Sequence, residues 1–332
     1  MMTINRQILL VSRPKGEPTL DNFHLAAPEL PELGEGQVLV RNFYLSLDPY
    51  MRGRMNDTKS YAPPQPLDTV MIGATAGEVV ESRHPDWQPG DAVTAMFGWQ
   101  EYGISDGSNL RRIDVARVPM SVYLGAAGMP GVTAWYGLNR IIAPKAGETV
   151  AVSAASGAVG SVVGQLAKRA GCRVVGIAGG EQKCTYVVET LGFDACVDYK
   201  AGNLDEALRN ATPDGIDGYF ENVGGAVFDA VLKNLNPHSR IALCGMISGY
   251  NGEPIPLKYP ALLLTNRVRL EGFIVTEHMD IWPQALTALA DAIAAGELRY
   301  RETMAQGIEN APSAFLGLLK GENFGKQIVR LV

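Results

Sequence analysis

Hydrophobic and polar positions follow two different patterns along the chain, and the pattern changes near residue 125. Before this point, short runs rich in β-branched and aromatic residues are separated by prolines and glycines, which predicts a β-rich domain. The clearest of these runs are QVLVRNFYLSL, GEVVES and DAVTAMFGWQEYGI. After it, apolar runs of strand length alternate with segments of helical period. This alternation predicts a doubly wound parallel sheet that binds its ligand at the carboxyl ends of its strands.

Five strands and the helices between them are predicted in the second region. The expected strands are TVAVSAA, CRVVGIA, ACVDY, GYFENV and RIALCGM, and the expected helices are SVVGQLAKRAG, EQKCTYVVETLG, NLDEALRNA, AVFDAVLKNL and the later IWPQALTALADAIAAGEL. The tail has a helical run, APSAFLGLLKG, and a last strand, KQIVRLV, which we expect to return to the first domain. The predicted fold class is therefore α/β, with one domain formed by residues 1–125 and 299–332 and a second by residues 126–298.

Composition narrows the class of protein. A chain of 332 residues exceeds the usual size of a single core, and its 46% hydrophobic content supports two. A net charge of −6 does not show the excess of basic residues that is typical of nucleic-acid-binding proteins. No apolar run reaches the ~18 residues of a membrane span, and the apolar stretch in MMTINRQILLVSRPKGEP is too short for a signal peptide. We therefore expect a cytoplasmic protein.

The stretch TVAVSAASGAVG, at 149–160, carries the strongest chemical signal. A strand runs into a tight turn that opens a helix, which is the layout of a dinucleotide pyrophosphate site. Gly157 would let the backbone approach the phosphates, and Gly160 would let the helix pack closely on the strand. Backbone N–H groups of the turn, including those of Ala158 and Val159, would hold the anion. Ala155 replaces the usual first glycine, and a turn that merely connects two core elements is the alternative.

The end of the next strand indicates which dinucleotide binds. About 20 residues after the glycine turn, an NAD site usually places an acid for the ribose 2′-hydroxyl. Here the chain reads Ala178-Gly179-Gly180, and Lys183 follows. Small residues leave room for a 2′-phosphate and a cation can neutralise it, so the sequence favours NADP(H), although Glu181 argues against this. A solvated lysine in the first turn of a helix is the alternative for Lys183.

Cysteine and histidine show no spacing that is typical of a metal site. The cysteines form no CxxC pair and lie mostly in apolar, strand-like surroundings, which predicts buried free thiols: Cys172, Cys184, Cys196 and Cys244. The histidines are scattered, with no HExxH motif: His24, His84, His238 and His278. We predict no metal.

Several motifs in a fixed order resemble the zinc-independent medium-chain dehydrogenases/reductases. Within that family the chain is most similar to the leukotriene B4 12-hydroxydehydrogenase/prostaglandin 15-keto reductase group, with its alkenal double-bond reductases and curcumin reductases. The resemblance covers nearly the whole chain and implies a GroES-like first domain and a Rossmann second domain. Its motifs are LSLDPYMR (45–52), GMPGVTAWYGL (128–138), VSAASGAVGSVVGQLAK (152–168), YFENVGG (219–225), CGMISGYN (244–251), FIV (273–275) and GENFGKQIV (321–329).

The resemblance also implies the chemistry. Zinc alcohol dehydrogenases carry a Cys ligand in the segment corresponding to LSLDPYM and a Gly-His-Glu segment later, where this chain reads IGATAGEVV. Their four-cysteine lobe is absent too. Without a metal ion as Lewis acid, the protein cannot polarise the carbonyl oxygen in the way that direct alcohol oxidation by the zinc mechanism requires. The implied reaction is NADPH-dependent reduction of the C=C bond of an enone or enal by hydride transfer to the β-carbon, with an enolate forming on the carbonyl oxygen.

Three side chains are predicted to take part in this reaction by stabilising the enolate oxygen. In the family, the nicotinamide ribose hydroxyl and a tyrosine do so. Tyr50 in DPYMR is expected to line the substrate cleft, and Tyr250 in ISGYN to lie near the cofactor; packing is the alternative for each. His278 stands where relatives with prostaglandin activity carry a tyrosine, so an imidazole could replace the phenol. A surface histidine on a mobile loop is the alternative.

The resemblance assigns further residues to the cofactor. Lys183 and Tyr199 would hold the 2′-phosphate. Asn222 and a loop after the fifth strand would contact the nicotinamide and ribose; that loop comprises Cys244, Gly245, Met246, Ile247, Ser248, Gly249 and Tyr250. A strand containing Phe273, Ile274 and Val275 would line the nicotinamide, with Met129 nearby and Asn323 reaching it from the tail.

Two other functions stay open at this point. One is a zinc-free quinone reductase, and the other is a non-catalytic NADPH-binding protein. The DPYMR, ISGYN and GENFGK segments favour the enone reductase over the quinone reductase, and the acidic net charge weighs against a nucleic-acid-binding role. The expected partners are a small-molecule enone or enal and, by resemblance, a second copy of the chain in a homodimer.

Overall fold

The computed structural model describes residues 3–252 and 254–332, and the chain divides into two compact units. The β-rich unit consists of Met1–Gly125 and Glu302–Val332, and the Rossmann unit of Ala126–Arg301. The second division comes at residue 302, where the sequence analysis set it at 299. Residue Arg299 stays with the Rossmann unit because its N–H and carbonyl both bond to the Gln165 side chain, each at 2.8 Å.

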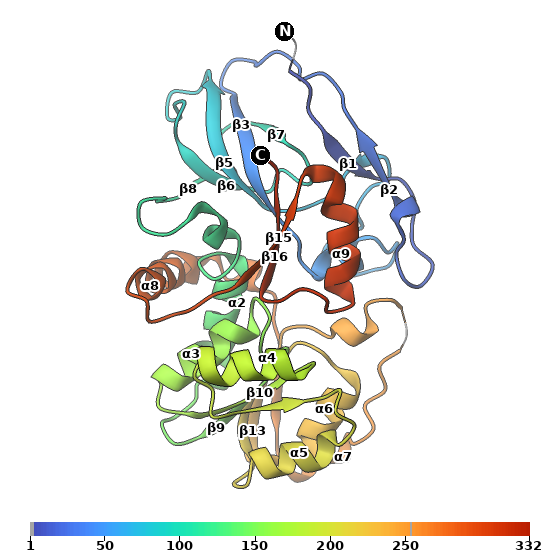
Figure 1. Cartoon of the computed structure of the whole chain (residues 1–332), viewed down its shortest axis with the longest axis vertical. Helices are drawn as coiled ribbons and strands as arrows, with labels where there is room; N and C mark the ends of the chain where they lie inside the picture. Colours follow the sequence, from blue (N-terminus) through green and yellow to red (C-terminus); the bar gives the residue numbers. More distant parts are fainter. Residues whose placement is uncertain (1–2, 253) are drawn as a thin grey trace. The chain divides into compact units, whose positions relative to one another are not determined.

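The β-rich unit is built on a seven-stranded sheet of order β15-β16-β3-β5-β6-β8, with β7 also paired to β3, and on a smaller sheet of order β2-β1-β4. The C-terminal strand β16 pairs antiparallel with β3, with Ile328 opposite Ser46, and α9 runs alongside it (Figure 1). The strands are β1 (Gln7–Leu10), β2 (Phe23–Ala26), β3 (Val38–Ser46), β4 (Thr69–Val70), β5 (Thr75–Ser82), β6 (Ala92–Ala95), β7 (Tyr102–Ser105), β8 (Arg111–Arg112), β15 (Glu302–Gln306) and β16 (Lys326–Arg330). The helices are η1 (Leu20–Asn22), α1 (Tyr50–Arg54), η2 (Met120–Leu124), η8 (Ile308–Asn310) and α9 (Ala311–Leu319).

One predicted strand of this unit is interrupted. The run DAVTAMFGWQEYGI forms β6 and β7 with a turn between them, because Gly98 adopts a φ of 83° and the following Trp99 enters the core. A side chain on Gly98 would have its Cβ 2.6 Å from the Met71 carbonyl oxygen. Trp99 is fully buried, stacks on Phe23 at 5.4 Å and meets the edge of Phe315 at 5.6 Å.

The Rossmann unit contains a six-stranded parallel sheet of order β11-β10-β9-β12-β13-β14. Its order reverses between β9 and β12, which is where doubly wound sheets bind ligands. The strands are β9 (Thr149–Ser153), β10 (Arg173–Ala178), β11 (Ala195–Asp198), β12 (Ile216–Glu221), β13 (Leu235–Leu243) and β14 (Arg269–Gly272). The helices are α2 (Met129–Tyr136), η3 (Gly137–Ile142), α3 (Gly160–Arg169), α4 (Glu181–Thr185), η4 (Tyr186–Thr190), α5 (Leu204–Ala211), α6 (Gly225–Leu232), η5 (Ile247–Gly249), α7 (Ala261–Thr265), η6 (Val275–Glu277), η7 (Met279–Ile281) and α8 (Trp282–Ala294) (Figure 1). The predicted α/β class, a Rossmann sheet with a β-rich GroES-like domain, is confirmed.

Two details differ from the prediction. The helix expected over EQKCTYVVETLG is a short α4 followed by the π-helical turn η4. The FIV segment, expected as a strand, lies just beyond the end of β14, and Val275 already belongs to η6. Within the described ranges, no helix combines the length and the apolar character that crossing a membrane requires.

Candidate cofactor and active site

The turn after β9 has the close packing that a pyrophosphate site needs. Ala154 takes a left-handed φ of 50°, and its carbonyl oxygen accepts the Gly157 N–H at 2.9 Å. A Cβ on Gly160 would lie 2.4 Å from the same oxygen, so this position accepts glycine alone. The N-terminus of α3 has no side-chain cap, which leaves its positive end suited to an anion. The turn therefore fits the dinucleotide phosphates, and the individual roles of its residues stay predictions.

The structure also explains why alanine is tolerated at the first position of the glycine motif. Ala155 is fully buried, and its methyl group faces Gly176 of β10. A Cβ on Gly176 would lie 2.8 Å from the Cβ of Ala155. Because Gly176 has no side chain, the Ala155 methyl group has room. In the usual motif, a glycine at the position of Ala155 removes the need for that room.

Lys183 and Tyr199, predicted to hold the 2′-phosphate, lie around the Gly179–Gly180 segment. Tyr199 follows β11 and its hydroxyl would be 2.9 Å from a Cβ on Gly179, so the phenol lies over that glycine. Lys183 lies in α4, where its backbone N–H bonds to the Gly180 carbonyl at 3.1 Å. Burial, and then the charge of nearby Lys200, lower the pKa of Lys183. Two cations at one sheet edge suit a phosphate, and Lys200 is a residue that the sequence analysis missed.

The acidic group at this edge is Asp198 at the end of β11. Its carboxylate accepts the Gly180 N–H at 2.8 Å and the Lys200 N–H at 2.9 Å. These backbone bonds lower the pKa of Asp198, so the group stays ionised and its charge is balanced by two donors. Glu181, which argued against NADP(H) in the sequence, is exposed in the first turn of α4.

Asn222 and the 244–250 loop come together, as the sequence analysis expected. The loop runs along the segment after β12: the Ile247 N–H bonds to the Asn222 carbonyl at 3.2 Å, and the Ser248 N–H to the Val223 carbonyl at 3.0 Å. The Asn222 side chain donates to the Ser153 carbonyl at 2.8 Å. These bonds place the predicted nicotinamide and ribose contacts beside the end of β9 and the glycine turn.

A buried carboxylate, which the sequence analysis missed, holds this arrangement. Glu221 accepts hydrogen bonds from the Tyr219 hydroxyl at 2.7 Å, the Ser153 hydroxyl at 3.0 Å and the backbone N–H groups of Val223 and Gly224. Burial raises its pKa, and these bonds oppose the shift. An acid directly after two aromatic residues at the end of the strand, in YFENVGG, was the signal that could have revealed it.

Tyr250 turns back onto its own loop. Its hydroxyl oxygen accepts the Met246 N–H at 3.4 Å and would lie 3.0 Å from a Cβ on Gly245. The phenol thus lies within the group of residues predicted to contact the cofactor. Cys244 begins the same loop, and burial followed by the charge of Glu221 raises its pKa to about 12.

His278 belongs to an aromatic cluster. Its ring stacks on Tyr136 with centroids 4.1 Å apart and an angle of 19° between the planes. Tyr136 also contacts Phe273, with ring centroids 5.4 Å apart, and the Trp282 indole N–H bonds to the Val275 carbonyl at 3.1 Å. The half-buried His278 is therefore packed against a ring rather than isolated on a loop. Met129 begins the helix that ends at Tyr136, a residue of the GMPGVTAWYGL motif to which no role was given.

Tyr50 and Asn323 lie in the β-rich unit, apart in sequence from the other predicted site residues. Tyr50 is the first residue of α1 and is half-buried; burial and then the charge of Asp48 raise the pKa of its hydroxyl well above its usual value. Asp48 pairs with the buried Lys326 at 3.0 Å. The Asn323 amide donates to the Gly325 carbonyl at 2.8 Å. Their roles toward substrate and cofactor stay predictions.

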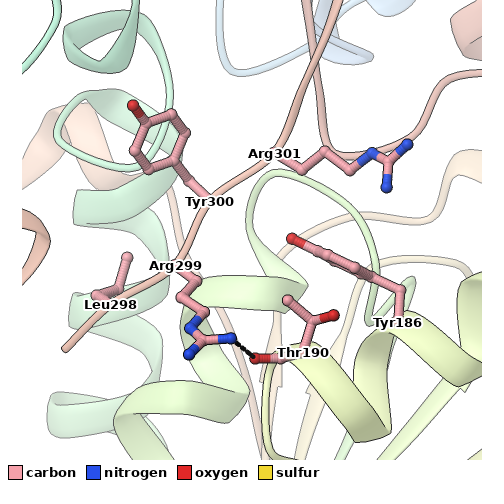
Figure 2. Close-up of a pocket in the computed structure, with 6 residues that line it drawn as sticks. All are labelled: Tyr186, Thr190, Leu298, Arg299, Tyr300 and Arg301. Atoms are coloured by element: carbon pink, nitrogen blue, oxygen red, sulfur yellow. Dashed lines mark hydrogen bonds between the residues drawn. The ribbon is translucent and has the colours of Figure 1, made fainter. Parts of the chain in front are cut away.

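A separate hollow of about 490 Å³ lies beside η4 and contains no predicted site residue. Figure 2 shows its lining of Tyr186, Thr190, Leu298, Arg299, Tyr300 and Arg301. Arg299 donates to the Thr190 carbonyl at 3.3 Å, and the Arg301 guanidinium lies 5.6 Å from the centre of the Tyr186 ring. Both arginines thus already have partners within the Rossmann unit. Across residues 3–252 and 254–332, no three His, Cys, Asp or Glu side chains form a group that could hold a metal ion.

Comparison with known proteins fits this geometry. Residues 6–113 match a family model described as the N-terminal domain of oxidoreductase, and residues 158–291 match one described as zinc-binding dehydrogenase. The NADPH-dependent curcumin reductase of Escherichia coli is 48% identical over 98% of this chain and 97% of that protein. The NADP(+)-dependent 2-alkenal reductase of Nicotiana tabacum is 44% identical over 98% and 97%.

A solved structure agrees over the whole length. CurA from Vibrio vulnificus in complex with NADPH is 47% identical, covers 98% of this chain and 99% of its own, and superposes with a TM-score of 0.93. The chain belongs to the medium-chain dehydrogenase/reductase family of oxidoreductases, in the group that contains the curcumin and 2-alkenal reductases.

Proposed function

We propose that the chain reduces the C=C bond of α,β-unsaturated ketones and aldehydes, leaves the carbonyl group intact, and works without zinc. Its family makes it an NADPH-dependent oxidoreductase; the bond, the substrate class and the independence from zinc are the proposal. The observation that carries it is the grouping of three features at the carboxyl ends of one sheet: the glycine turn, the pair Lys183 and Tyr199, and the 244–250 loop beside Asn222. One relative is named for 2-alkenals, which are conjugated aldehydes.

The residues of the chain must stabilise the charge that develops during such a reduction. Bound NADPH would supply the hydride for the β-carbon. Negative charge then develops on the carbonyl oxygen of the substrate, and fixed hydrogen-bond donors stabilise it. Tyr50, Tyr250 and His278 are the proposed donors. The raised pKa of Tyr50 keeps its hydroxyl protonated, which a donor requires.

Independence from zinc rests on the missing ligands. The segment IGATAGEVV, which corresponds to the Gly-His-Glu segment of zinc alcohol dehydrogenases, leads into β5 and supplies Thr75, Ala76 and Val79 to the buried interior. The segment contains no histidine or cysteine to coordinate zinc. Reduction of a conjugated C=C bond needs no metal to polarise an isolated carbonyl.

The proposed macromolecular partner is a second copy of the chain. Strand β14 is the last strand of the Rossmann sheet, and all four of its residues are exposed. An open strand edge presents backbone N–H and carbonyl groups that can pair with another strand. Leu270, 38% exposed on this strand, adds apolar surface. The same edge on two chains could pair about a two-fold axis, which gives a homodimer.

A substrate panel tests the proposed reaction. NADPH oxidation should be measured with an aliphatic 2-alkenal, an aromatic enone and a quinone, and the products identified by mass spectrometry and NMR. We expect turnover of the enal and enone, with saturated carbonyl compounds as products. Allylic alcohols would show carbonyl reduction and contradict the proposal. Turnover of the quinone alone would identify a quinone reductase, and NADPH binding without any turnover a non-catalytic protein.

A further inference from the structure

Two of the four cysteines lie close enough to react with each other. The sulfur atoms of Cys184 and Cys196 are 3.0 Å apart. Cys184 lies in α4 and Cys196 in β11, and both residues are half-buried rather than enclosed in the core. Cys172, by contrast, is buried, and its thiol faces the Lys145 carbonyl at 3.5 Å. The prediction of four buried thiols was therefore wrong for three of them, because Cys244 is also half-buried.

The contact shifts the pKa values of the two thiols in opposite directions. The Cys196 thiol donates its hydrogen bond to the Cys184 sulfur. This bond lowers the pKa of Cys184 and raises that of Cys196, so Cys184 is the group that ionises first. A thiolate is the reactive form of cysteine toward peroxides and disulfides. The pair thus contains an attacking sulfur and a second thiol poised to resolve the product.

Disulfide formation at this site requires little movement. A disulfide bond is about 2.05 Å long, so the two sulfur atoms must approach by roughly 1 Å. Cys184 lies in a helix of one turn, Glu181–Thr185, that continues as a π-helical turn. Such a short segment can shift by this amount more readily than β11, which is hydrogen-bonded to β10 at the edge of the sheet.

We propose that Cys184 and Cys196 form a peroxide-sensitive dithiol, and that its disulfide form binds NADPH more weakly than the reduced form. The Cys184 thiolate attacks one oxygen of hydrogen peroxide, the O–O bond breaks, and the hydroxide that leaves is protonated to water. Cys184 is now a sulfenic acid. The Cys196 sulfur attacks it, the S–O bond breaks, and hydroxide leaves with the Cys196 proton as a second water. Two thiols have lost two electrons, and the peroxide has gained them.

The effect on NADPH follows from the neighbours of the pair and rests on the proposed cofactor site. Lys183 directly precedes Cys184 in α4, and Tyr199 follows Cys196 by three residues. A shift of α4 toward β11 moves Lys183 relative to the 2′-phosphate it would bind. We expect the KM for NADPH to rise about three- to tenfold, part of what a well-placed charge-assisted contact contributes. NADH lacks this phosphate, so its KM should stay the same.

Peptide mass spectrometry tests the disulfide. Trypsin cuts after Lys183 and Lys200, so both cysteines fall in one peptide, 184–200. The full chain is treated with hydrogen peroxide, alkylated and digested. We expect this peptide to become lighter by two hydrogens, to resist alkylation, and to recover on treatment with dithiothreitol, while Cys172 and Cys244 stay alkylated. Continued alkylation of Cys184 and Cys196, or oxygen addition without a disulfide, would overturn the proposal.

Kinetics on the same samples test the effect on the cofactor. The KM for NADPH and for NADH is measured before and after peroxide in the wild type, in Cys184→Ser, which lacks the attacking thiolate, and in the matched control Cys172→Ser. The rise should appear in the wild type and in Cys172→Ser, and be absent in Cys184→Ser. An equal rise in Cys184→Ser, or a disulfide without any rise, contradicts the proposal. A reduced enzyme without preference for NADPH would instead contradict the proposed cofactor site, and the peptide mass would still decide on the dithiol.

Discussion

Lys183 shows how much the surroundings of one side chain add to its identity. Taken alone in the sequence, it is a lysine in the first turn of a helix, for which a solvated side chain is the simpler interpretation, and the family resemblance favours the phosphate contact. In the structure it is half-buried, the charge of Lys200 acts on it, and it lies in the helix that follows Gly179 and Gly180. Tyr199 covers Gly179, whereas a Cβ on Gly180 would meet no atom within 4 Å, which leaves open space there. Two close cations repel each other, and an anion bound between them relieves that repulsion.

Changing Lys183→Ala should therefore weaken NADPH binding and spare NADH. A charge-assisted hydrogen bond to phosphate contributes about 1.5–3 kcal/mol, so the KM for NADPH should rise roughly ten- to a hundredfold. Steady-state kinetics with both cofactors measure this. Lys15→Ala, at an exposed lysine of the β-rich unit, is the matched control and should leave both values unchanged. Equal KM values for NADPH and NADH in the wild type would rule out the assignment.

The three proposed donors can be separated by removing one polar atom at a time. Removing a well-placed donor costs about 10²–10³ in kcat. We expect Tyr50→Phe and Tyr250→Phe to split into one strong and one weak effect, and the strong one identifies the donor. If Tyr50 is that donor, activity should persist as the pH rises past 10, the usual pKa of tyrosine, because burial and Asp48 raise its own pKa.

His278 belongs to the same experiment. Its stacking on Tyr136 fixes the ring, so His278→Ala removes both a donor and a packing contact, whereas His278→Phe keeps the ring alone. A donor role requires that both variants lose kcat. If no variant at the three positions lowers kcat by more than a few-fold, backbone groups, water or the ribose hydroxyl must stabilise the enolate.

At the level of elements, a buried ion pair fixes the segment that carries Tyr50. Lys326 of β16 donates to the Asp48 carboxylate at 3.0 Å and to the carbonyls of Leu47 and Gln327. Lys326 is 4% exposed and Asp48 5%. The C-terminal strand thus holds the DPYM segment by a charge as well as by the sheet.

Replacing Lys326→Met should destabilise the chain by about 3–5 kcal/mol, because Asp48 would stay buried without its partner. Urea unfolding followed by circular dichroism measures the loss. The double change Asp48→Asn with Lys326→Met should recover part of it. Lys320→Met, at a lysine with a 57% exposed side chain, is the control and should stay within about 0.5 kcal/mol of the wild type. A Lys326→Met variant as stable as the wild type would show that the pair contributes no net stability.

The spacing of hydrophobic residues predicted the strands and helices, but it did not predict where some of them are interrupted. The strands and helices around the parallel sheet follow the predicted order, because buried strands and amphipathic helices repeat their own periods. The break between β6 and β7 depends on the positive φ of Gly98 and the burial of Trp99, which are tertiary effects. The π-helical turn after α4 and the end of β14 before Phe273 are likewise set by packing.

For the whole molecule, the fold and the family followed from motifs that occur in order along the chain. Part of the candidate site could be predicted from the sequence. Asn222 was expected near the 244–250 loop, and Lys183 near Tyr199, because the carboxyl ends of parallel strands meet at one edge of the sheet. The sequence analysis missed Glu221, Lys200 and the Cys184–Cys196 contact. Glu221 had a local signal, an acid directly after two aromatic residues in YFENVGG. Lys200 and the cysteine contact depend on which strands are neighbours and on how a helix sits against them, and no local pattern encodes that.

The metal content of the whole chain tests the proposal that the reaction proceeds without zinc. Exhaustive chelation with EDTA should leave the enone reductase activity unchanged, and elemental analysis should find no stoichiometric zinc. The reason is that IGATAGEVV has no histidine where zinc alcohol dehydrogenases carry their Gly-His-Glu segment, and that the four-cysteine lobe is absent. One zinc per chain, with activity lost on its removal and restored on its return, would contradict the proposal.

The open edge of β14 sets the last expectation, which concerns assembly. A homodimer would scatter light as twice the chain mass of 35.6 kDa. In a two-fold interface each residue on the edge faces the same surface of its partner, so one substitution acts twice. Leu270→Lys places two like charges at the paired edges and should shift the measured mass toward a single chain. Leu20→Lys, at an exposed leucine of the β-rich unit, is the matched control and should leave the mass unchanged. A wild-type chain that scatters as a monomer at all concentrations rules out the dimer, and a Leu270→Lys dimer as tight as the wild type rules out this edge as its contact.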